Sequence, residues 1–345
     1  MATFRTVNKL PTEELKVTDS TLCHVGKVKL SISHSLLPWN PSRLLTSRNH
    51  HVTAVAVATG ASSGIGLALP KHLLSRQWAV VTADINPPPA DLGPSTLFVP
   101  CDVSSWEQQA ALFARAFAWH DRLDFAALNA GIDDRDDIFA SIDTTTSPRE
   151  PNMQTFQTNF IAPYYGIKLC AHYMSRNAVP GGKIVVTASA AGLYALPAIP
   201  QYSATKHGLV GLTRSLAPLA DRRASNITLN ALCPAMVATG LAPPGLTDGF
   251  PAEHTTPMLT LLRAYDDLAH FGGVARDEWR TSPRRPNGCI VECTLAETHY
   301  RDPPEAPNGS HQWMSTGSSE YWAKAYAERN RWFAEMDWKA GSNGA

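Results

Sequence analysis

A serine, a tyrosine and a lysine near the middle of the chain have the residue types and the spacing of proton-transfer chemistry. Tyr202 and Lys206 stand four residues apart in a predicted helix, so both side chains project from one face. A phenol titrates at a pH of about 10, and a neighbouring ammonium lowers that pKa toward the range in which the phenol acts as a base. Ser189 follows a predicted strand and can donate a hydrogen bond to a substrate oxygen. These residues predict acid–base catalysis on an alcohol or a carbonyl.

A glycine-rich turn precedes this group in the chain and is suited to hold a pyrophosphate. A strand leads into the turn and a helix follows it, so backbone amides at the helix N-terminus can approach an anion closely. The turn reads Thr59, Gly60, Ala61, Ser62, Ser63, Gly64, Ile65 and Gly66. Its sequence predicts a dinucleotide site.

Asp84 indicates which dinucleotide the turn would hold. It ends the second predicted strand, eighteen residues after Gly66, where a carboxylate can bind both ribose hydroxyls of an adenosine. A 2′-phosphate would meet its negative charge, and Ser62, Ser63, Ile85 and Asn86 supply no cation to hold one. NAD is therefore favoured, and NADP stays open.

Short apolar runs alternate with helical patterns from residue 52 onward, which is typical of a parallel sheet with crossover helices. We expect a single α/β domain: a three-layer Rossmann fold around a doubly wound, mostly parallel sheet of seven strands. The predicted strands are Thr53–Ala58, Ala79–Ala83, Thr96–Val99, Phe125–Leu128, Lys183–Thr187, Thr228–Leu232 and Cys289–Cys293. The predicted helices are Trp106–Trp119, Met153–Asn177, Gln201–Ala220 and Met258–Ala269.

Several motifs in order give the chain a resemblance to the short-chain dehydrogenase/reductases with a T-G-x-x-x-G-x-G turn. The resemblance spans about Ala54 to Cys293 and implies that Tyr202 is the acid/base, that Ser189 polarises the substrate oxygen and that Lys206 binds the nicotinamide ribose. It also implies that Asn159 links the lysine to solvent through water. The remaining cofactor contacts that it implies are Asp102 and Val103 at the adenine, Asn129, Ala130 and Gly131 beside the cofactor, and Val237 and Thr239 at the carboxamide.

Two residues depart from the family pattern. Ala235 stands where the family's P-G-x-x-x-T segment has glycine, which is tolerable if its φ is negative. Pro70 falls inside the helix after Gly66, so that helix is expected to start late or to bend.

The family's usual G-K-V start is separated here from the rest of its strand. Gly26-Lys27-Val28 precedes Ala56-Val57-Ala58 by some 27 residues, and no acidic residue occurs between Ser20 and Ala83. We hypothesise that 29–55 is an insertion, arising from a retained intron or a mis-joined exon; a genuine flexible arm and a basic binding arm are the alternatives. The expected organisation is an extension over 1–54, a cofactor-binding catalytic domain over 55–300 and a tail over 301–345.

The amino-acid composition limits the kinds of partner that the protein can bind. The 345 residues are 44% hydrophobic and 17% charged, and 30 basic residues balance 30 acidic ones, so no overall field would attract nucleic acid or an anionic membrane. The first thirty residues hold no apolar signal segment, and we expect a cytoplasmic protein. Six cysteines without metal-ligand spacing predict free thiols and no metal site.

The expected reaction is hydride transfer between nicotinamide and a hydrophobic secondary alcohol or ketone. Apolar residues dominate the predicted substrate lid and the helix after it: Leu241, Leu246, Phe250, Met258, Leu261 and Leu262. A similarity to the hydroxyprostaglandin-dehydrogenase-like subgroup, which includes enzymes of fungal polyketide and terpenoid pathways, implies a secondary-metabolite substrate. The alternative is a non-redox scaffold acting as an isomerase, cyclase or regulator.

The tail is predicted to end in an aromatic helix over 321–337. Trp322, Tyr326, Arg329, Phe333 and Met336 recur there at helical spacing. We expect this face to pack on the parent domain or on a sister subunit, with a wall of the substrate pocket as the alternative. The family resemblance implies a homodimer or homotetramer.

Overall fold

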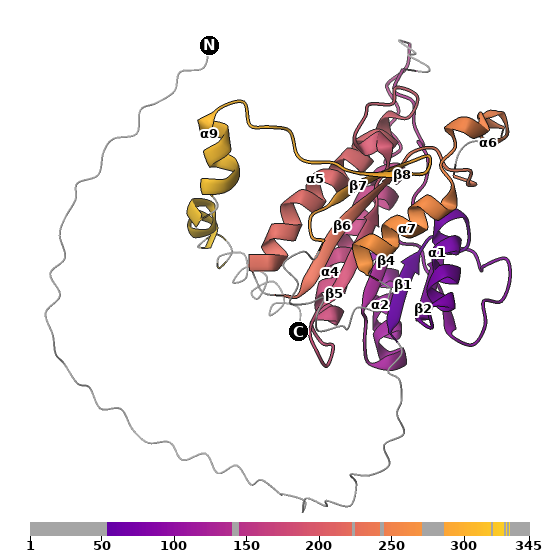
Figure 1. The fold of residues 1–345 in the computed structure, drawn as a ribbon. Coiled ribbons are helices and arrows are strands. Elements are labelled where there is room, and N and C mark those ends of the chain that lie inside the picture. Colours follow the sequence, from indigo (N-terminus) through magenta and orange to yellow (C-terminus); the bar gives the residue numbers. More distant parts are fainter. Residues whose placement is uncertain are drawn as a thin grey trace, which may run out of the picture. The chain divides into compact units, whose positions relative to one another are not determined.

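An eight-stranded sheet forms the centre of the fold (Figure 1). The computed structural model describes residues 54–139, 145–222, 225–241, 245–270, 286–318, 320–327, 329 and 331, all within a unit that spans His51–Ala345. The strand order is β3-β2-β1-β4-β5-β6-β7-β8, and the first seven strands are parallel while β8 pairs antiparallel with β7. The strands are β1 (Val55–Thr59), β2 (Ala79–Asp84), β3 (Thr96–Pro100), β4 (Phe125–Leu128), β5 (Gly182–Thr187), β6 (Ile227–Pro234), β7 (Ile290–Thr294) and β8 (Glu297–Tyr300).

Helices cover both faces of the sheet. Residues of α1 and α7 form one hydrophobic cluster with the strands, and residues of α2, α4 and α5 form the cluster on the other face. The longer helices are α1 (Gly64–Ser75), α2 (Trp106–His120), α4 (Ala162–Met174), α5 (Pro200–Arg222) and α7 (Met258–Ala269). The shorter ones are α3 (Gln154–Phe156), η2 (Gln157–Ile161), η3 (Ala190–Gly192), α6 (Leu246–Gly249), η4 (Ala252–His254), α9 (Gly309–Gln312) and η5 (Trp313–Gly317).

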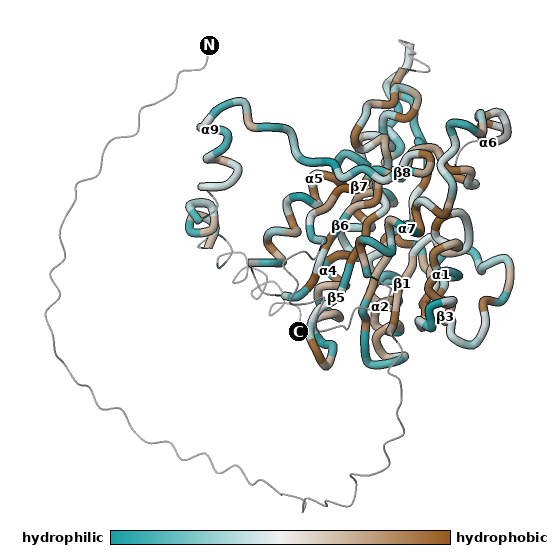
Figure 2. The backbone as a smooth tube through the Cα atoms, in the orientation of Figure 1, coloured by the Kyte–Doolittle hydropathy of each residue, from teal (hydrophilic) through white to brown (hydrophobic). Residues whose placement is uncertain are grey.

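The strands are buried on both sides, which explains their composition. Every residue of β1, β4 and β6 is buried, and β1 and β4 are almost entirely apolar rather than alternating between apolar and polar residues. Hydrophobic residues are concentrated in the sheet and in the helices that pack on it, whereas the segment leading from β8 to α9 is largely hydrophilic (Figure 2). The three-layer Rossmann fold expected from the sequence is confirmed.

The sheet has one strand more than predicted. β8 follows β7 through a two-residue turn in which Leu295 has φ 49°. A turn with positive φ usually carries Asn-Gly or Asp-Gly, and Leu-Ala gives no such signal. The strand itself, Glu-Thr-His-Tyr, is short and partly exposed, so nothing in its composition marked it.

The predicted helix Met153–Asn177 is interrupted by a π-helical turn. α3, η2 and α4 follow one another directly, and the π turn at Gln157–Ile161 carries the buried Asn159. Asn177 lies beyond α4, which ends at Met174, and its side chain bonds both the amide and the carbonyl of Leu123. Such π turns are frequent at functional sites, and periodicity alone does not reveal them.

The tail differs from its prediction where it is described. The rings of Trp322 and Tyr326 stack at 5.5 Å, and Arg329 lies 3.8 Å above the Tyr326 ring. The two rings are 49% and 37% exposed, so they do not pack into the core of this chain. Packing on a sister subunit stays a prediction, and Phe333 and Met336 lie outside the described residues. The hypothesised insertion 29–55 also lies outside the described residues, apart from its last two residues.

Candidate active site

Ser189, Tyr202 and Lys206 converge at the carboxyl edge of the sheet. Ser189 follows β5 and caps η3, accepting a hydrogen bond from the Ala191 amide at 3.1 Å, and its hydroxyl is close enough to the Tyr202 phenol to lower the pKa of that phenol. Tyr202 is half-buried in the first turn of α5, and Lys206 lies one turn later with its Nζ 5.2 Å from the centre of the tyrosine ring. The group predicted from spacing is thus assembled.

The electrostatics of Tyr202 differ from the expectation of a lowered pKa. Burial raises the pKa of Tyr202 to about 12; the hydrogen bond with Ser189 opposes this, while the Asp133 carboxylate adds to it. Burial also lowers the pKa of Lys206 to about 8. Desolvation is the largest of these effects on the Tyr202 pKa, so without cofactor the phenol is protonated and able to donate a proton.

Lys206 is enclosed by main-chain and amide groups. Its Nζ donates to the Thr187 carbonyl at 2.7 Å. A Cβ added at Gly131 would lie 3.6 Å from that Nζ, an ordinary contact, and 3.3 Å from Oδ1 of Asn159, so only the Asn159 amide would have to shift, by a few tenths of an ångström. The Asn159 amide exchanges two hydrogen bonds of 2.8 Å with the backbone of Ile132. Asn159 therefore fixes the loop after β4; its role in a water relay stays a prediction.

The glycine turn fits a pyrophosphate. Gly60 and Gly64 have φ 64° and 48°, and a Cβ at Gly66 would lie 1.9 Å from the Gly60 carbonyl oxygen. Helix α1 begins at Gly64, earlier than Pro70 led us to expect, and has no acidic residue in its first turn and no side-chain cap from Ser63. Its first amides are thus open to an anion.

Asp84 stands at the end of β2 beside this turn. Its Oδ2 accepts from the Ser62 amide at 3.0 Å and its Oδ1 from the Asn86 amide at 3.0 Å, while the Ser62 hydroxyl donates to the Asn86 carbonyl at 2.6 Å. The carboxylate is thereby held where the ribose of a bound dinucleotide is expected. Ile65, like the residues around it, lies in the first turn of α1.

Asp102 and Val103 follow β3. Asp102 Oδ1 accepts from the amide and hydroxyl of Ser104, and the carbonyl of the buried Val103 accepts from Gln109 at 2.6 Å. These contacts stiffen the loop on which the adenine contact is predicted.

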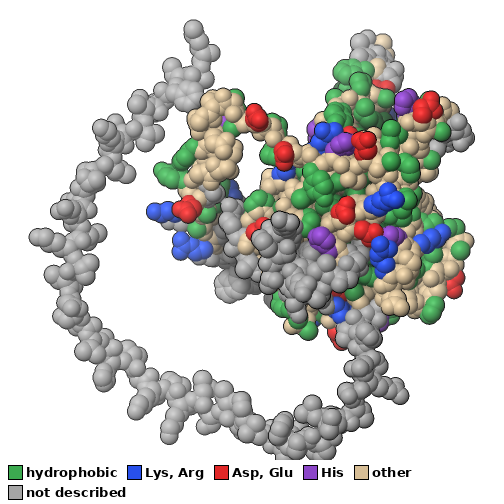
Figure 3. Space-filling view, viewed as in Figure 1, with side chains coloured by type: hydrophobic (Ala, Val, Ile, Leu, Met, Phe, Trp, Pro, Cys, Tyr) green, Lys and Arg blue, Asp and Glu red, His purple; other side chains and the backbone are tan. Residues whose placement is uncertain are grey.

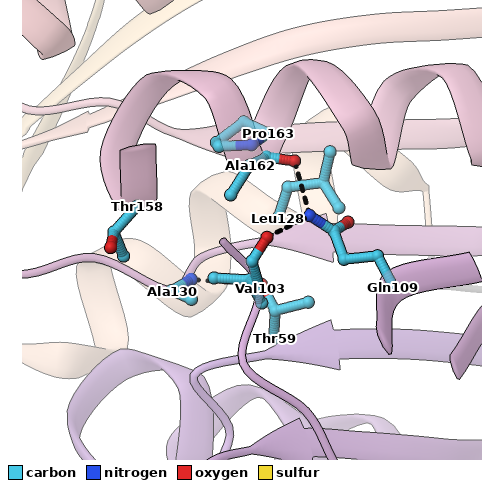
Figure 4. Close-up of a pocket in the computed structure, with 8 residues that line it drawn as sticks. All are labelled: Thr59, Val103, Gln109, Leu128, Ala130, Thr158, Ala162 and Pro163. Carbon is cyan, nitrogen blue, oxygen red and sulfur yellow. Dashed lines mark hydrogen bonds between the residues drawn. The ribbon is translucent and has the colours of Figure 1, made fainter. Parts of the chain in front are cut away.

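Asn129 and Ala130 are tied to the glycine turn through Thr59. The Thr59 hydroxyl accepts from the amides of Asn129 and Ala130 at 2.9 and 3.1 Å, and Thr187 donates to Oδ1 of Asn129. Figure 4 shows a small pocket beside this junction, where Gln109 donates to the carbonyls of Val103 and Ala162. The pocket is lined by Thr59, Val103, Gln109, Leu128, Ala130, Thr158, Ala162 and Pro163, so it does not include the serine, tyrosine and lysine.

The segment after β6 closes the site from the other side. Thr239 faces the glycine turn, since a Cβ at Gly64 would lie 3.0 Å from its Cγ2. Val237 packs against the core cluster of α1 and α7. Ala235 is not among the described non-glycine residues with positive φ, so its replacement of glycine causes no backbone strain. Leu261, expected at the substrate lid, is instead fully buried in the core.

Four residues near the site were not predicted to be site residues. Asp133 and Asp134 lie in the loop after β4, and Asp134 accepts hydrogen bonds from the amides of Gln201 and Tyr202. Thr187 and the buried Tyr265 share a hydrogen bond of 3.0 Å behind Lys206. These contacts join residues up to 78 positions apart, and no local pattern reveals them.

The described residues form neither a metal-binding cluster nor a membrane-spanning helix. Within the described ranges, no group of three or more His, Cys, Asp or Glu is placed to hold a metal ion. No helix in the described part of the chain is both long enough and apolar enough to span a membrane. Cys101, Cys170, Cys233, Cys289 and Cys293 are free thiols, as expected; Cys23 lies outside the described residues.

Comparison with known proteins identifies the family of the chain. The family profile described as short chain dehydrogenase matches residues 54–246. The chain is 30% identical over 277 residues to the short-chain dehydrogenase/reductase prx6 of Penicillium rubens, covering 74% of this chain and 88% of that one. It is 34% identical over 202 residues to human 15-hydroxyprostaglandin dehydrogenase [NAD(+)], covering 54% and 69%.

A solved structure shares the fold. The 3-ketoacyl-(acyl-carrier-protein) reductase of Brucella melitensis, complexed with NADH, superposes with a TM-score of 0.57 at 22% identity over 70% of this chain and 96% of that one. The family profile and the match to prx6 show that the chain belongs to the short-chain dehydrogenase/reductase family, NAD(P)-dependent oxidoreductases that act on CH–OH groups.

Proposed function

We propose that the protein interconverts a hydrophobic secondary alcohol and its ketone, with NAD favoured over NADP. The observation that carries the proposal is the contact between the hydroxyls of Ser189 and Tyr202 with Lys206 beside them. When bound, NAD(P) supplies or accepts the hydride. The protein's own residues supply the proton and polarise the substrate oxygen.

The proton step follows from the described geometry. In reduction, the Tyr202 phenol, whose pKa burial raises to about 12, donates its proton to the substrate oxygen, which Ser189 polarises by a second hydrogen bond. In oxidation, Tyr202 takes the proton from the substrate hydroxyl. Its pKa must first be lowered toward neutral pH by a nearby positive charge. Lys206 provides that charge at neutral pH, since its own pKa is about 8.

The rim of the site supports a hydrophobic substrate. The loops that follow β4, β5 and β6 all reach the carboxyl edge of the sheet, and each exposes large apolar side chains. They are Ile138 (69% exposed), Phe139 (80%), Tyr194 (49%), Leu196 (43%), Leu241 (41%) and Leu246 (50%). The similarity to fungal short-chain dehydrogenases such as prx6 supports a secondary-metabolite intermediate of polyketide or terpenoid type.

The choice of NAD rests on Asp84, whose carboxylate is fixed at the end of β2 by two backbone amides. The relative whose name specifies NAD(+) supports the same choice. A small molecule and further copies of this chain, as a homodimer or homotetramer, are the proposed partners; nucleic acid and membrane are not. The interspersed acidic and basic side chains on the visible face in Figure 3 support that exclusion.

Tyr202→Phe tests the proposal. With NAD and a panel of hydrophobic secondary alcohols, the wild type should produce NADH, and the variant should lose turnover by about a thousandfold while still binding NAD. Tyr164→Phe, on an exposed position of α4, should keep full turnover. NADH production that survives Tyr202→Phe would show that Tyr202 is not the proton-transfer group. A wild type that binds NAD but produces no NADH from any alcohol of the panel would favour a non-redox scaffold instead.

A further inference from the structure

The loop after β4 is bonded at every residue from Ile132 to Asp136. Asn159 holds the backbone of Ile132, and the Thr155 hydroxyl donates to the Asp133 carbonyl at 3.0 Å. Further along, Asp136 accepts from the Asn152 amide at 2.9 Å. The loop is thus a fixed platform beside Tyr202.

Asp134 connects this platform to the helix that carries the tyrosine. Its two carboxylate oxygens accept from the amides of Gln201 (2.9 Å) and Tyr202 (2.5 Å). Both amides lie in the first turn of the 23-residue α5, where they have no partner within the helix. A negative group there also complements the helix dipole.

Gln201 reinforces the same junction. Its buried side chain accepts from the Arg135 amide at 3.2 Å and donates to the Asn152 carbonyl at 2.9 Å. Four hydrogen bonds therefore join the loop and the segment before α3 to the first turn of α5, directly at the residue that must reach Ser189.

We propose that Asp134 is a positioning residue, which fixes the first turn of α5 and thereby holds the Tyr202 phenol against Ser189 and beside Lys206. The inference deepens the proposed function and rests on it, because it takes Tyr202 as the proton-transfer group. The other groups that face the phenol are Asp133 from the same loop and Cys233 from β6; neither bonds the backbone of α5's first turn in the described structure.

The test compares Asp134→Ala and Asp134→Asn with Asp137→Ala, an exposed aspartate of the same loop. Asp134→Ala should lower kcat about tenfold, since small misplacements of catalytic groups have effects of this size or larger, with KM for NAD changed less than twofold. Asp134→Asn keeps one oxygen acceptor and should recover part of kcat. All rates are measured well below the unfolding temperature of each variant, so that lost stability alone does not lower them.

Amide hydrogen exchange gives a second readout that needs no substrate. The amides of Gln201 and Tyr202 should exchange about fivefold or more faster in Asp134→Ala, the size expected for a lost helix cap, and unchanged in Asp137→Ala. Unchanged exchange at these amides, or a kcat within twofold of the wild type, overturns the positioning role. If the wild type itself turns over no substrate, the proposed function fails, and exchange still decides whether Asp134 fixes the helix.

Discussion

Lys206 donates a hydrogen bond of 2.7 Å to the carbonyl oxygen of Thr187, and the hydroxyl of the same threonine contacts Asn129 and Tyr265. The ammonium is therefore held by backbone at the end of β5, in a position connected to the glycine turn through Asn129 and Thr59. A charge so buried is costly to the fold and useful to the reaction, and substitutions can separate the two effects.

Lys206→Met should remove activity and stabilise the protein. The pKa of Lys206 falls from its ordinary value to about 8 through burial, which corresponds to about 3 kcal/mol against the charged form. The lost bond to Thr187 offsets part of this, so we expect the free energy of unfolding at pH 7 to rise by about 1–2 kcal/mol. Denaturant unfolding of both proteins measures it.

The sign of the pH dependence checks the cause. A lowered lysine pKa in the folded state means that the unfolded chain binds more protons between about pH 8 and 10.5, so wild-type stability rises with pH over that window. The advantage of the methionine variant should therefore shrink from pH 8 upward. Lys168→Met, on an exposed position of α4, should change stability by less than about 0.5 kcal/mol at any pH. A constant difference across the window would contradict desolvation as the cause.

Asp133→Asn should shift the pH profile of alcohol oxidation to lower pH. The Asp133 carboxylate adds to the raised pKa of Tyr202, so removing its charge makes the phenol easier to ionise, by up to about one pH unit. The measurement is kcat against pH at saturating NAD. Asp137→Asn serves as the control, and a profile that coincides with the wild type would show that Asp133 does not act on Tyr202.

Asp84→Asn should weaken the preference for NAD. The substitution keeps the size of the side chain but removes the charge that repels a 2′-phosphate, so the ratio of kcat/KM for NAD over NADP should fall about tenfold. Asp91→Asn, which alters an exposed aspartate bonded only locally to Gly93 among the described contacts, should leave the ratio unchanged. A preference for NADP in the wild type would overturn the assignment of Asp84.

Two glycine-to-alanine substitutions distinguish a glycine that is required for close backbone packing from one that only lowers helix propensity. Gly66→Ala would place Cβ 1.9 Å from the Gly60 carbonyl oxygen, so the turn must shift, and we expect loss of NAD binding with a cost of several kcal/mol. Gly211→Ala, on α5 with nothing within 4 Å, should stabilise the protein by about 0.5–1 kcal/mol. Thermal unfolding and NAD titration of both variants give the comparison.

Local patterns predicted the parts of the site that are local. Tyr202 and Lys206 lie one helical turn apart, and the glycine turn directly follows β1 and opens α1, so spacing along the chain was enough to identify them. The seven parallel strands were equally visible, because most of their residues are apolar and buried and longer helical patterns separate them along the chain.

Interactions between distant segments were not predictable in the same way. Asp134 bonds residues 67 and 68 positions away, and an aspartate after N-A-G-I-D is an ordinary loop residue by composition. The raised pKa of Tyr202 is a property of its burial, which spacing does not report. The expectation of a lowered pKa considered the ammonium and omitted the desolvation.

The short antiparallel strand β8 also determines where the chain can be shortened. Glu292 on β7 is buried, and its charge is balanced by Arg301 just after β8, with a nitrogen–oxygen distance of 2.5 Å. Arg214 of α5 holds the carbonyls of Arg301 and Asp302. A protein ending at β7 would leave a carboxylate without its counter-ion inside the sheet and an open strand edge. The smallest stable form should therefore extend through Asp302, well past residue 246 where the family profile stops.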